Sequence, residues 1–275
     1  MPMPSTALVT GATAGFGAEI CRRLSRDGVR VIAAGRRTER LLSLQAELGG
    51  PERCHVVTLD VRDRAATEAL VASLPAAWQA IDLCVNNAGL ALGLEMADAA
   101  SLDDWETMVD TNCKVCPRRR CLRNGLTTST QPQGLMFVTR AVLPGMKLRN
   151  CGHVVNIGST AAEWPYPGAN VYGASKAFVR QFSLNLRADL LGSLVRVTDI
   201  EPGMCSGTEF SNVRFRGDDA KAAAVYANTL TPSLGAEDVA DAVAWVASRP
   251  AHVNINLMQL MPVSQAFGPL AVKRV

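Results

Sequence analysis

The chain has 275 residues, enough for one α/β domain with a full hydrophobic core, and nothing in its length requires a second domain. Hydrophobic residues make up 48% and charged residues 19%, which excludes a disordered chain, and a net charge of +3 is too small to suggest nucleic-acid binding. No apolar run approaches the ~18 to 20 residues of a membrane span, and no secretory signal is visible, so we expect a cytoplasmic protein without a membrane partner.

The order of elements predicts the fold class. Residues 6–10 (TALVT) form a short apolar strand, GATAGFG follows it, and an amphipathic helix then runs to Gly28. Further apolar strands are predicted at 29–35, 54–61, 81–89, 153–159 and 195–203, and helices at 37–48, 64–74, from about 102, and at 171–190. Buried strands that alternate with amphipathic helices indicate a single doubly wound parallel sheet with helices on both faces.

Small and polar residues follow several of these strands. Gly11, Asn86, Ser159 and Pro202 all fall near the ends of predicted strands. In open parallel sheets, ligands bind beyond the carboxyl ends of the strands. We therefore expect the functional site to lie at this edge.

Glycines after the first strand indicate a nucleotide site. Only glycine lets a backbone approach a pyrophosphate closely at a helix N-terminus, where unpaired amides and the helix dipole favour an anion. Gly11, Gly15 and Gly17 are so placed. The alternative is a tight strand-to-helix turn that binds no ligand.

The end of the second strand indicates which nucleotide binds. Sites that prefer NAD place an acidic residue there for the ribose 2′-hydroxyl, whereas this chain has Arg36 and Arg37, with no carboxylate before Glu39. Guanidinium groups match a 2′-phosphate, so we predict NADP(H). The alternative is that both arginines only cover the surface.

A tyrosine and a lysine in YGASK indicate proton transfer. Tyr172 and Lys176 are four residues apart, so they share one face of a helix. The pKa of a phenol is near ~10, and a neighbouring cation in a partly dry cleft can lower it toward neutrality. Such pairs also occur by chance on solvated helices.

TGATAGFG, NNAG, Asn112, Ser159, YGASK and the PG at 202–203 occur in the order and spacing of the classical short-chain dehydrogenases/reductases, which this chain resembles over nearly its whole length. The resemblance implies a Rossmann-like fold, a nicotinamide cofactor and a homotetramer. It implies that Tyr172 is the catalytic acid and base and that Lys176 lowers its pKa and holds the nicotinamide ribose. It also implies that Ser159 bonds the substrate oxygen and that Asn112 anchors a water between Lys176 and solvent.

The cofactor-binding residues implied by the resemblance come from all the nucleotide-end motifs. They are Gly11, Thr13, Gly15, Phe16, Gly17, Arg36, Arg37, Asp60, Val61, Asn87, Ala88, Gly89, Tyr172, Lys176, Pro202, Gly203 and Thr208. Asp60 would meet the adenine, Asn87 and Gly89 would flank the ribose, and residues 202–208 would cover the nicotinamide.

Several stretches are similar to the NADP-dependent 3-hydroxy acid dehydrogenases that also oxidise serine and allo-threonine. They are GRRTERL, WPYPGANVYGASKAFVRQF, GTEFSNVRFRGDDAKA and EDVADAVAWVASRPAHVNINLMQLMPVSQ. This similarity implies a small 3-hydroxy acid substrate, such as serine, allo-threonine, 3-hydroxyisobutyrate or the pair 3-hydroxypropionate/malonic semialdehyde. The alternatives are a catalytically silent NADP-binding protein and a carbonyl reductase for other ketones or aldehydes.

A segment after the PG pair indicates how the substrate is bound. Arg214 and Arg216 lie between apolar residues, which suits a lid that brings a guanidinium over a small carboxylate. We favour Arg214 for this role. The alternative is a basic surface paired with Asp218 and Asp219.

The family pattern breaks after Asn112, where residues 115–133 look inserted into the single domain of residues 1–275. Joining Lys114 to Gly134 would restore one amphipathic helix, whereas the segment itself is rich in poor helix formers and has four arginines and no acidic residue. It could be a basic functional loop, a tolerated insertion or a retained intron, and we favour the third. A real insertion would endanger Asn112 and the assembly of a tetramer.

Eight cysteines are scattered through the chain, several within apolar patterns, so no disulfide framework is predicted. Cys113, Cys116 and Cys121 lie close together, but no further cysteine or histidine follows at zinc-ligand spacing. We expect no metal site.

Overall fold

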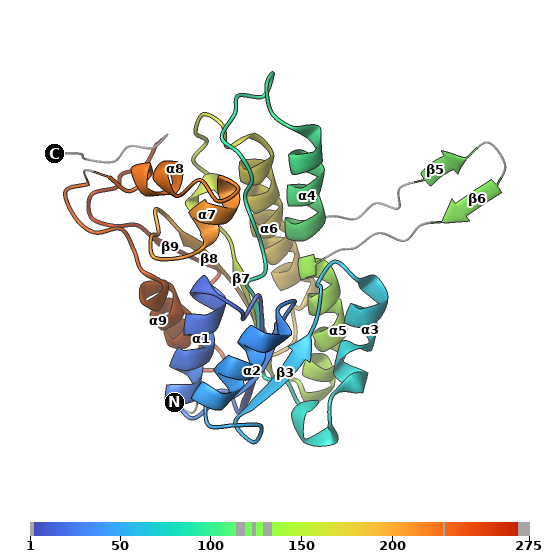
Figure 1. Ribbon diagram of the computed structural model, residues 1–275. Helices are drawn as coiled ribbons and strands as arrows, with labels where there is room; N and C mark the ends of the chain where they lie inside the picture. Colours follow the sequence, from blue (N-terminus) through green and yellow to red (C-terminus); the bar gives the residue numbers. More distant parts are fainter. Residues whose placement is uncertain (1–2, 114–118, 123–124, 129–133, 228, 269–275) are drawn as a thin grey trace.

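The computed structural model describes residues 3–113, 119–122, 125–128, 134–227 and 229–268 (Figure 1). At its centre is an all-parallel seven-stranded sheet in the order β3-β2-β1-β4-β7-β8-β9. Its strands are β1 (Thr6–Thr10), β2 (Arg30–Gly35), β3 (Cys54–Thr58), β4 (Leu83–Asn86), β7 (Gly152–Ile157), β8 (Val195–Pro202) and β9 (Leu257–Leu260). The strand order reverses between β1 and β4, and this switch point is where such sheets open a crevice for ligands.

Helices cover both faces of the sheet (Figure 1). On one face pack α1 (Gly15–Arg26), α2 (Thr38–Glu47) and α9 (Ala236–Ala247), and on the other α3 (Arg64–Ser73), α5 (Gly134–Arg149) and α6 (Asn170–Asp189). Alternate residues of β1 serve the two cores: Ala7 and Val9 pack with α1 and α9, and Leu8 packs with α3 and α5. The predicted fold class, a doubly wound parallel sheet, is confirmed.

The remaining helices gather near the carboxyl ends of the strands. They are α4 (Leu102–Asn112), which packs on α6, and the short α7 (Phe210–Arg214) and α8 (Asp219–Ala224), which pack on each other. Two single 3-10 turns also occur, η1 (Ala76–Trp78) and η2 (Thr160–Ala162). The helices α7 and α8, in the segment after β8, thus lie near the carboxyl edge of the sheet (Figure 1).

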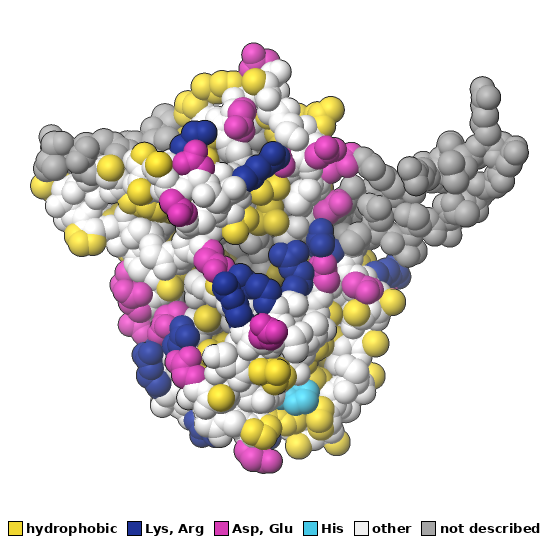
Figure 2. All heavy atoms as spheres, in the orientation of Figure 1, with side chains coloured by type: hydrophobic (Ala, Val, Ile, Leu, Met, Phe, Trp, Pro, Cys, Tyr) yellow, Lys and Arg dark blue, Asp and Glu magenta, His cyan; other side chains and the backbone are white. Residues whose placement is uncertain are grey.

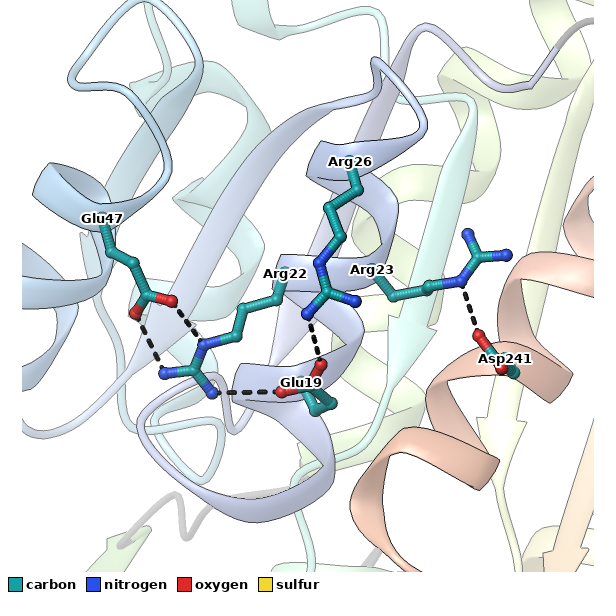
Figure 3. Close-up of polar contacts among 6 residues, drawn as sticks. All are labelled: Glu19, Arg22, Arg23, Arg26, Glu47 and Asp241. Carbon is teal, nitrogen blue, oxygen red and sulfur yellow. Dashed lines mark hydrogen bonds and ion pairs between the residues drawn. The ribbon is translucent and has the colours of Figure 1, made fainter.

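Ion pairs hold α1 to its neighbours on the outside (Figure 3). Arg22 binds Glu47 of α2 at 2.7 Å and Glu19 of its own helix at 3.3 Å. Arg23 reaches Asp241 of α9 at 2.5 Å. Each exposed pair contributes at most ~1 kcal/mol to stability. The buried apolar face of α1 therefore does most to hold this helix on the sheet.

The structure differs from the predicted elements in a few places. The strands predicted at 54–61 and 81–89 are shorter, and the backbone after β4 turns away so that the amides of Asn87 and Ala88 both donate to the hydroxyl of Thr10 at 3.1 Å. The edge strand β9 was not predicted, because its four residues are only half-buried and lack a clear pattern.

The predicted insertion lies between α4 and α5. Two short strands occur there, β5 (Arg119–Leu122) and β6 (Gly125–Thr128), which pair antiparallel as a separate sheet and were not predicted. Residues 114–118, 123–124 and 129–133 lie outside the described part of the chain. The origin of the segment stays a prediction.

The cysteines whose side chains are described are all free thiols, four of them buried. Cys116 and Cys121, part of the cysteine cluster noted in the sequence, lie outside this set. Across the described residues, no cluster of three or more potential metal-binding side chains occurs, and none of the helices has both the length and the hydropathy to cross a bilayer.

Candidate active site

A cleft of about 320 Å³ opens at the carboxyl edge of the sheet, over the switch point between β1 and β4. The glycine turn, the ends of β2 and β3, the segment after β4, α6 and the segment leading into α7 all line it. Among the predicted cofactor residues, those that line it are Gly11, Thr13, Gly15, Phe16, Arg36, Arg37, Asp60, Val61, Asn87, Ala88, Gly89, Tyr172, Lys176 and Thr208.

The glycine turn leaves room only for hydrogen at two positions. A Cβ on Gly17 would lie 2.2 Å from the carbonyl oxygen of Gly11, and one on Gly11 would lie 2.9 Å from Nδ2 of Asn87. Gly11 also has φ +67, which favours glycine. The turn therefore brings backbone close to the N-terminus of α1, which fits the pyrophosphate of a dinucleotide.

Arginines gather at the other end of the cleft, where β2 meets α2, and Figure 2 shows basic side chains grouped near the middle of this face. Arg37 donates to the hydroxyl of Thr13 through Nε at 3.1 Å and a terminal nitrogen at 2.9 Å. Asp60 pairs with Arg62 at 2.7 Å, and hydrogen bonds from Arg62 hold the pKa of Asp60 below its usual value. The predicted 2′-phosphate and adenine residues thus lie together.

Tyr172 lies in the first turn of α6 and is 7% exposed. Burial raises the pKa of Tyr172 above the usual value for a phenol, while a hydrogen bond from Ser159 and the positive charge of Arg214 act in the opposite direction. The net shift is opposite to the lowering expected from Lys176. The physical reason is that desolvation of a buried phenolate outweighs the neighbouring charges.

Lys176 lies one turn further along α6, with its Nζ 5.9 Å from the centre of the Tyr172 ring. The ammonium donates to the carbonyl oxygen of Ile157 at 2.8 Å. Burial lowers the pKa of Lys176, and the buried carboxylates of Asp199 and Glu201 on β8 oppose this shift. Lys176 is thus fixed between the end of β7 and Tyr172.

Asn112 is the last residue of α4 and is buried. Its Nδ2 donates to the carbonyl oxygen of Leu90 and the hydroxyl of Ser175, both at 2.9 Å, and its Oδ1 accepts from the amide of Leu90 at 3.0 Å. A Cβ on Gly89 would lie 3.2 Å from Asn112 Oδ1 and 3.7 Å from Lys176 Nζ. The structure therefore places Asn112 near Lys176 even though α4 ends there.

Arg214 and Arg216 take different positions. Arg214 has its guanidinium carbon 5.5 Å from the centre of the Tyr172 ring and donates to the hydroxyl of Tyr166 at 2.9 Å and the carbonyl oxygen of Gly93 at 3.1 Å. Arg216 is exposed and pairs with Asp104 at 2.7 Å. Of the two predicted substrate arginines, the favoured Arg214 is the one beside Tyr172.

This geometry is that of a dehydrogenase site, and the comparison with known families agrees. The profile of the family described as "short chain dehydrogenase" matches residues 5–116 and 127–218. The chain belongs to this family. As the sequence motifs predicted, it is an oxidoreductase that acts on CH–OH groups.

Similar proteins include close relatives in the short-chain dehydrogenase family. The "NADP-dependent 3-hydroxy acid dehydrogenase YdfG" of Escherichia coli (strain K12) is 59% identical over 97% of this chain and 98% of its own. "Sulfoacetaldehyde reductase 2" of Chromohalobacter salexigens is 47% identical over 99% of this chain and 100% of its own. A solved structure, "The Closed form of serine dehydrogenase complexed with NADP+", is 58% identical with a TM-score of 0.86, covering 98% of this chain and 100% of that one.

Three predicted cofactor residues are not part of the cleft lining. Gly17 packs against Gly11, as described, and the amide of Gly203 bonds to Leu260 of β9 while a Cβ there would lie 2.3 Å from Gln265 Oε1. Pro202 is the buried last residue of β8.

Sequence reasoning missed several residues near the site. Arg40 lies one helical turn after Arg37, so the periodicity of α2 could have indicated it. Tyr166 and Glu209 occur in stretches already singled out, but their partners are 48 and up to 172 residues away along the chain. Nothing local in the sequence predicts such pairs.

Proposed function

We propose that this protein is an NADP-dependent oxidoreductase that transfers hydride between the nicotinamide and a small 3-hydroxy acid of the serine, allo-threonine, 3-hydroxyisobutyrate or 3-hydroxypropionate type. The observation that supports it most is the position of Arg214 beside Tyr172, because a guanidinium there can hold an anionic group while the phenol meets the hydroxyl. The arginines at the end of β2 favour a cofactor with a 2′-phosphate.

The names of the relatives support an anionic substrate. The enzyme from Escherichia coli is named for hydroxy acids and that from Chromohalobacter salexigens for an aldehyde that bears a sulfonate. Carboxylate and sulfonate differ in shape but share a negative charge close to the reacting carbon. A cation beside the catalytic tyrosine serves both.

In this proposal the protein side chains move the proton and hold the substrate. Tyr172 as phenolate takes the proton of the substrate hydroxyl in oxidation and returns it in reduction. Ser159 donates a hydrogen bond to the same oxygen, and Lys176 stabilises the phenolate. When bound, the nicotinamide accepts or supplies the hydride at its C4 carbon.

The test is a comparison of matched substrates with NADP+ and purified protein. The control alcohol, 2-methylpropan-1-ol, has a methyl group in place of the carboxylate of 3-hydroxyisobutyrate. The specificity constant kcat/KM should be roughly a hundredfold higher for the acid, because a charge-assisted hydrogen bond is worth about 1.5–3 kcal/mol. 2-Hydroxyethanesulfonate tests whether the site accepts a sulfonate. Serine tests whether it tolerates an added ammonium.

Each alternative gives a different result. NADP+ binding without turnover of any substrate would support the silent binding protein, and equal or faster turnover of neutral carbonyl compounds would support the carbonyl reductase. Tyr172 and Lys176 line one cleft, and Ser159 bonds to Tyr172, which favours the enzyme. The homotetramer and the cytoplasmic location remain predictions.

A further inference from the structure

One carboxylate bridges two arginines at the nucleotide end of the cleft. Glu209 accepts from Arg37 at 2.8 Å and from Arg40 at 2.7 Å. Hydrogen bonds from Arg40 and Arg37 hold its pKa below the usual value, so the carboxylate is charged at neutral pH. All three side chains are about half exposed, so the pairs are accessible to a competing anion.

The bridge lies where the phosphorylated end of the cofactor is expected. Arg37, which binds Glu209, also binds Thr13 of the glycine turn, and Glu209 itself lines the cleft together with Arg36. A 2′-phosphate bound by Arg37 would need donors that Glu209 takes. Carboxylate and phosphate would also repel each other across a few ångströms.

Glu209 is joined directly to the segment that covers Tyr172. It immediately precedes α7, in which Phe210 lies 5.8 Å from the Tyr172 ring and Arg214 lies over that ring. Arg214 is held by Gly93 and Tyr166 at the far end of α7, and Arg216 just beyond it by Asp104. Release of Glu209 would therefore remove one of the anchors at the start of α7, where Ser211 also bonds to Tyr226 at 2.6 Å, while the other end stays attached.

We propose that the carboxylate of Glu209 competes with the cofactor's 2′-phosphate for the donors of Arg37 and Arg40. The phosphate displaces Glu209 when the cofactor binds. The proposal rests on the proposed function, which assigns the 2′-phosphate to the arginines that follow β2, among them Arg37. A phosphate monoester with a charge near −1.5 to −2 outcompetes a single carboxylate, whereas a 2′-hydroxyl does not. Glu209 thus sets how tightly the phosphorylated cofactor binds and links that binding to the position of α7.

The test uses two adenosine nucleotides that differ only in the 2′-phosphate, adenosine 2′,5′-bisphosphate and adenosine 5′-phosphate, measured by calorimetry on the full chain. Glu209→Gln should tighten binding of the bisphosphate by roughly three- to tenfold and change binding of the monophosphate less than twofold. Glu209→Ala should do the same. Glu47→Gln removes an identical charge from an ion pair with Arg22 that joins α1 and α2 (Figure 3) and is not part of the cleft lining, so it should change neither.

A second readout follows the segment itself. In the unsubstituted protein, the bisphosphate should speed hydrogen exchange at the amides of residues 210–213, and the monophosphate should not. In Glu209→Gln these amides should already exchange faster without nucleotide. Slower exchange on bisphosphate binding would contradict displacement of Glu209.

Arg37→Ala distinguishes the assignment of the 2′-phosphate to this arginine from the competition by Glu209. If it weakens bisphosphate binding tenfold or more while Glu209→Gln leaves that binding unchanged or weaker, the phosphate site stands and the competition is wrong. If Arg37→Ala leaves the preference for the bisphosphate unchanged, the assignment of the 2′-phosphate to this arginine fails, and the proposal about Glu209 fails with it.

Discussion

Arg214 and Tyr172 lie next to each other, with the guanidinium carbon 5.5 Å from the centre of the phenol ring. The arginine comes from α7, after β8, and the tyrosine from the start of α6, so the segment after β8 places a cation beside the phenol. The positive charge of Arg214 is one of two influences that lower the pKa of Tyr172 against the effect of burial. One residue can therefore serve both the substrate anion and the proton transfer.

Replacing Arg214 should reveal both roles. Arg214→Leu should raise KM for 3-hydroxyisobutyrate at least tenfold more than KM for 2-methylpropan-1-ol, because only the acid has a carboxylate to lose. With the neutral alcohol, the rising limb of kcat/KM against pH should move to higher pH, since removal of a cation raises the pKa of Tyr172 and oxidation needs the phenolate.

The matched control is Arg216→Leu, which removes the same charge at a position two residues after Arg214. Arg216 pairs with Asp104. It should leave the ratio of the two KM values and the pH profile unchanged. Equal changes for acid and alcohol in Arg214→Leu would remove Arg214 from substrate binding, and an unmoved pH limb would remove it from the electrostatics of Tyr172.

Tyr172→Phe should abolish turnover while NADP+ still binds. The substitution deletes the one hydroxyl proposed to exchange the substrate proton and leaves the ring that packs against Phe210. We expect kcat to fall by at least roughly a thousandfold, in the range found for general acid–base groups, with the Kd for NADP+ within a few-fold. Tyr226→Phe, which removes a hydroxyl bonded to Ser211 at 2.6 Å, is the control. Residual activity near that of Tyr226→Phe would exclude Tyr172 as the acid and base.

Two buried carboxylates behind Lys176 should make stability depend on pH. Asp199 and Glu201 on β8 are at most 1% exposed, and burial, reinforced by the charge of Glu201, raises the pKa of Asp199 to about 7. Lys176 and Arg180 are the nearby cations and oppose this shift. The folded protein then binds a proton at Asp199 that the unfolded chain, with a pKa near ~3.9, has already lost.

The sign follows from that difference in bound protons. The contribution of Asp199 to the free energy of unfolding is present below pH ~4 and is lost as the pH rises through about 7. Asp199→Asn imitates the protonated acid, so its stability advantage over the unsubstituted protein should be larger at pH 8.5 than at pH 5, by roughly 1–3 kcal/mol. Urea unfolding at both pH values measures this.

Asp241→Asn is the control for this measurement, because it removes a carboxylate that is 67% exposed and pairs only at the surface with Arg23. It should shift stability by a similar small amount at both pH values. A stability difference for Asp199→Asn that is the same at pH 5 and pH 8.5 would show that Asp199 does not bind a proton in this range.

The sequence predicted the parts of the fold that depend on local pattern. The apolar run of β1, the glycines after it and the face shared by Tyr172 and Lys176 need only neighbours along the chain, and all lie where the pattern indicated. Motif order supplied Asn112 and Ser159, which no periodicity would have singled out. The short-chain dehydrogenase family followed from these motifs together.

The remainder depends on long-range contacts. Glu209 meets Arg37 across 172 residues, and the upward pKa shift of Tyr172 follows from a burial that no spacing reveals. Asp199 and Glu201 did leave a signal, since acidic residues at i and i+2 of a buried strand must share one environment. Their effect on Lys176 still required the pairing of β7 with β8.

The glycine turn allows a last test of how tightly the nucleotide end is built. Gly17→Ala places a Cβ 2.2 Å from the carbonyl oxygen of Gly11, a backbone atom that cannot move aside without opening the turn. We expect the free energy of unfolding to fall by at least about 2 kcal/mol and NADP+ to bind at least tenfold more weakly. Gly28→Ala, at the other end of α1, meets nothing within 4 Å but has φ +86, so it should cost about 1 kcal/mol and leave NADP+ binding unchanged. Equal NADP+ affinity in the two variants would mean that close backbone approach at Gly17 does not form the cofactor site.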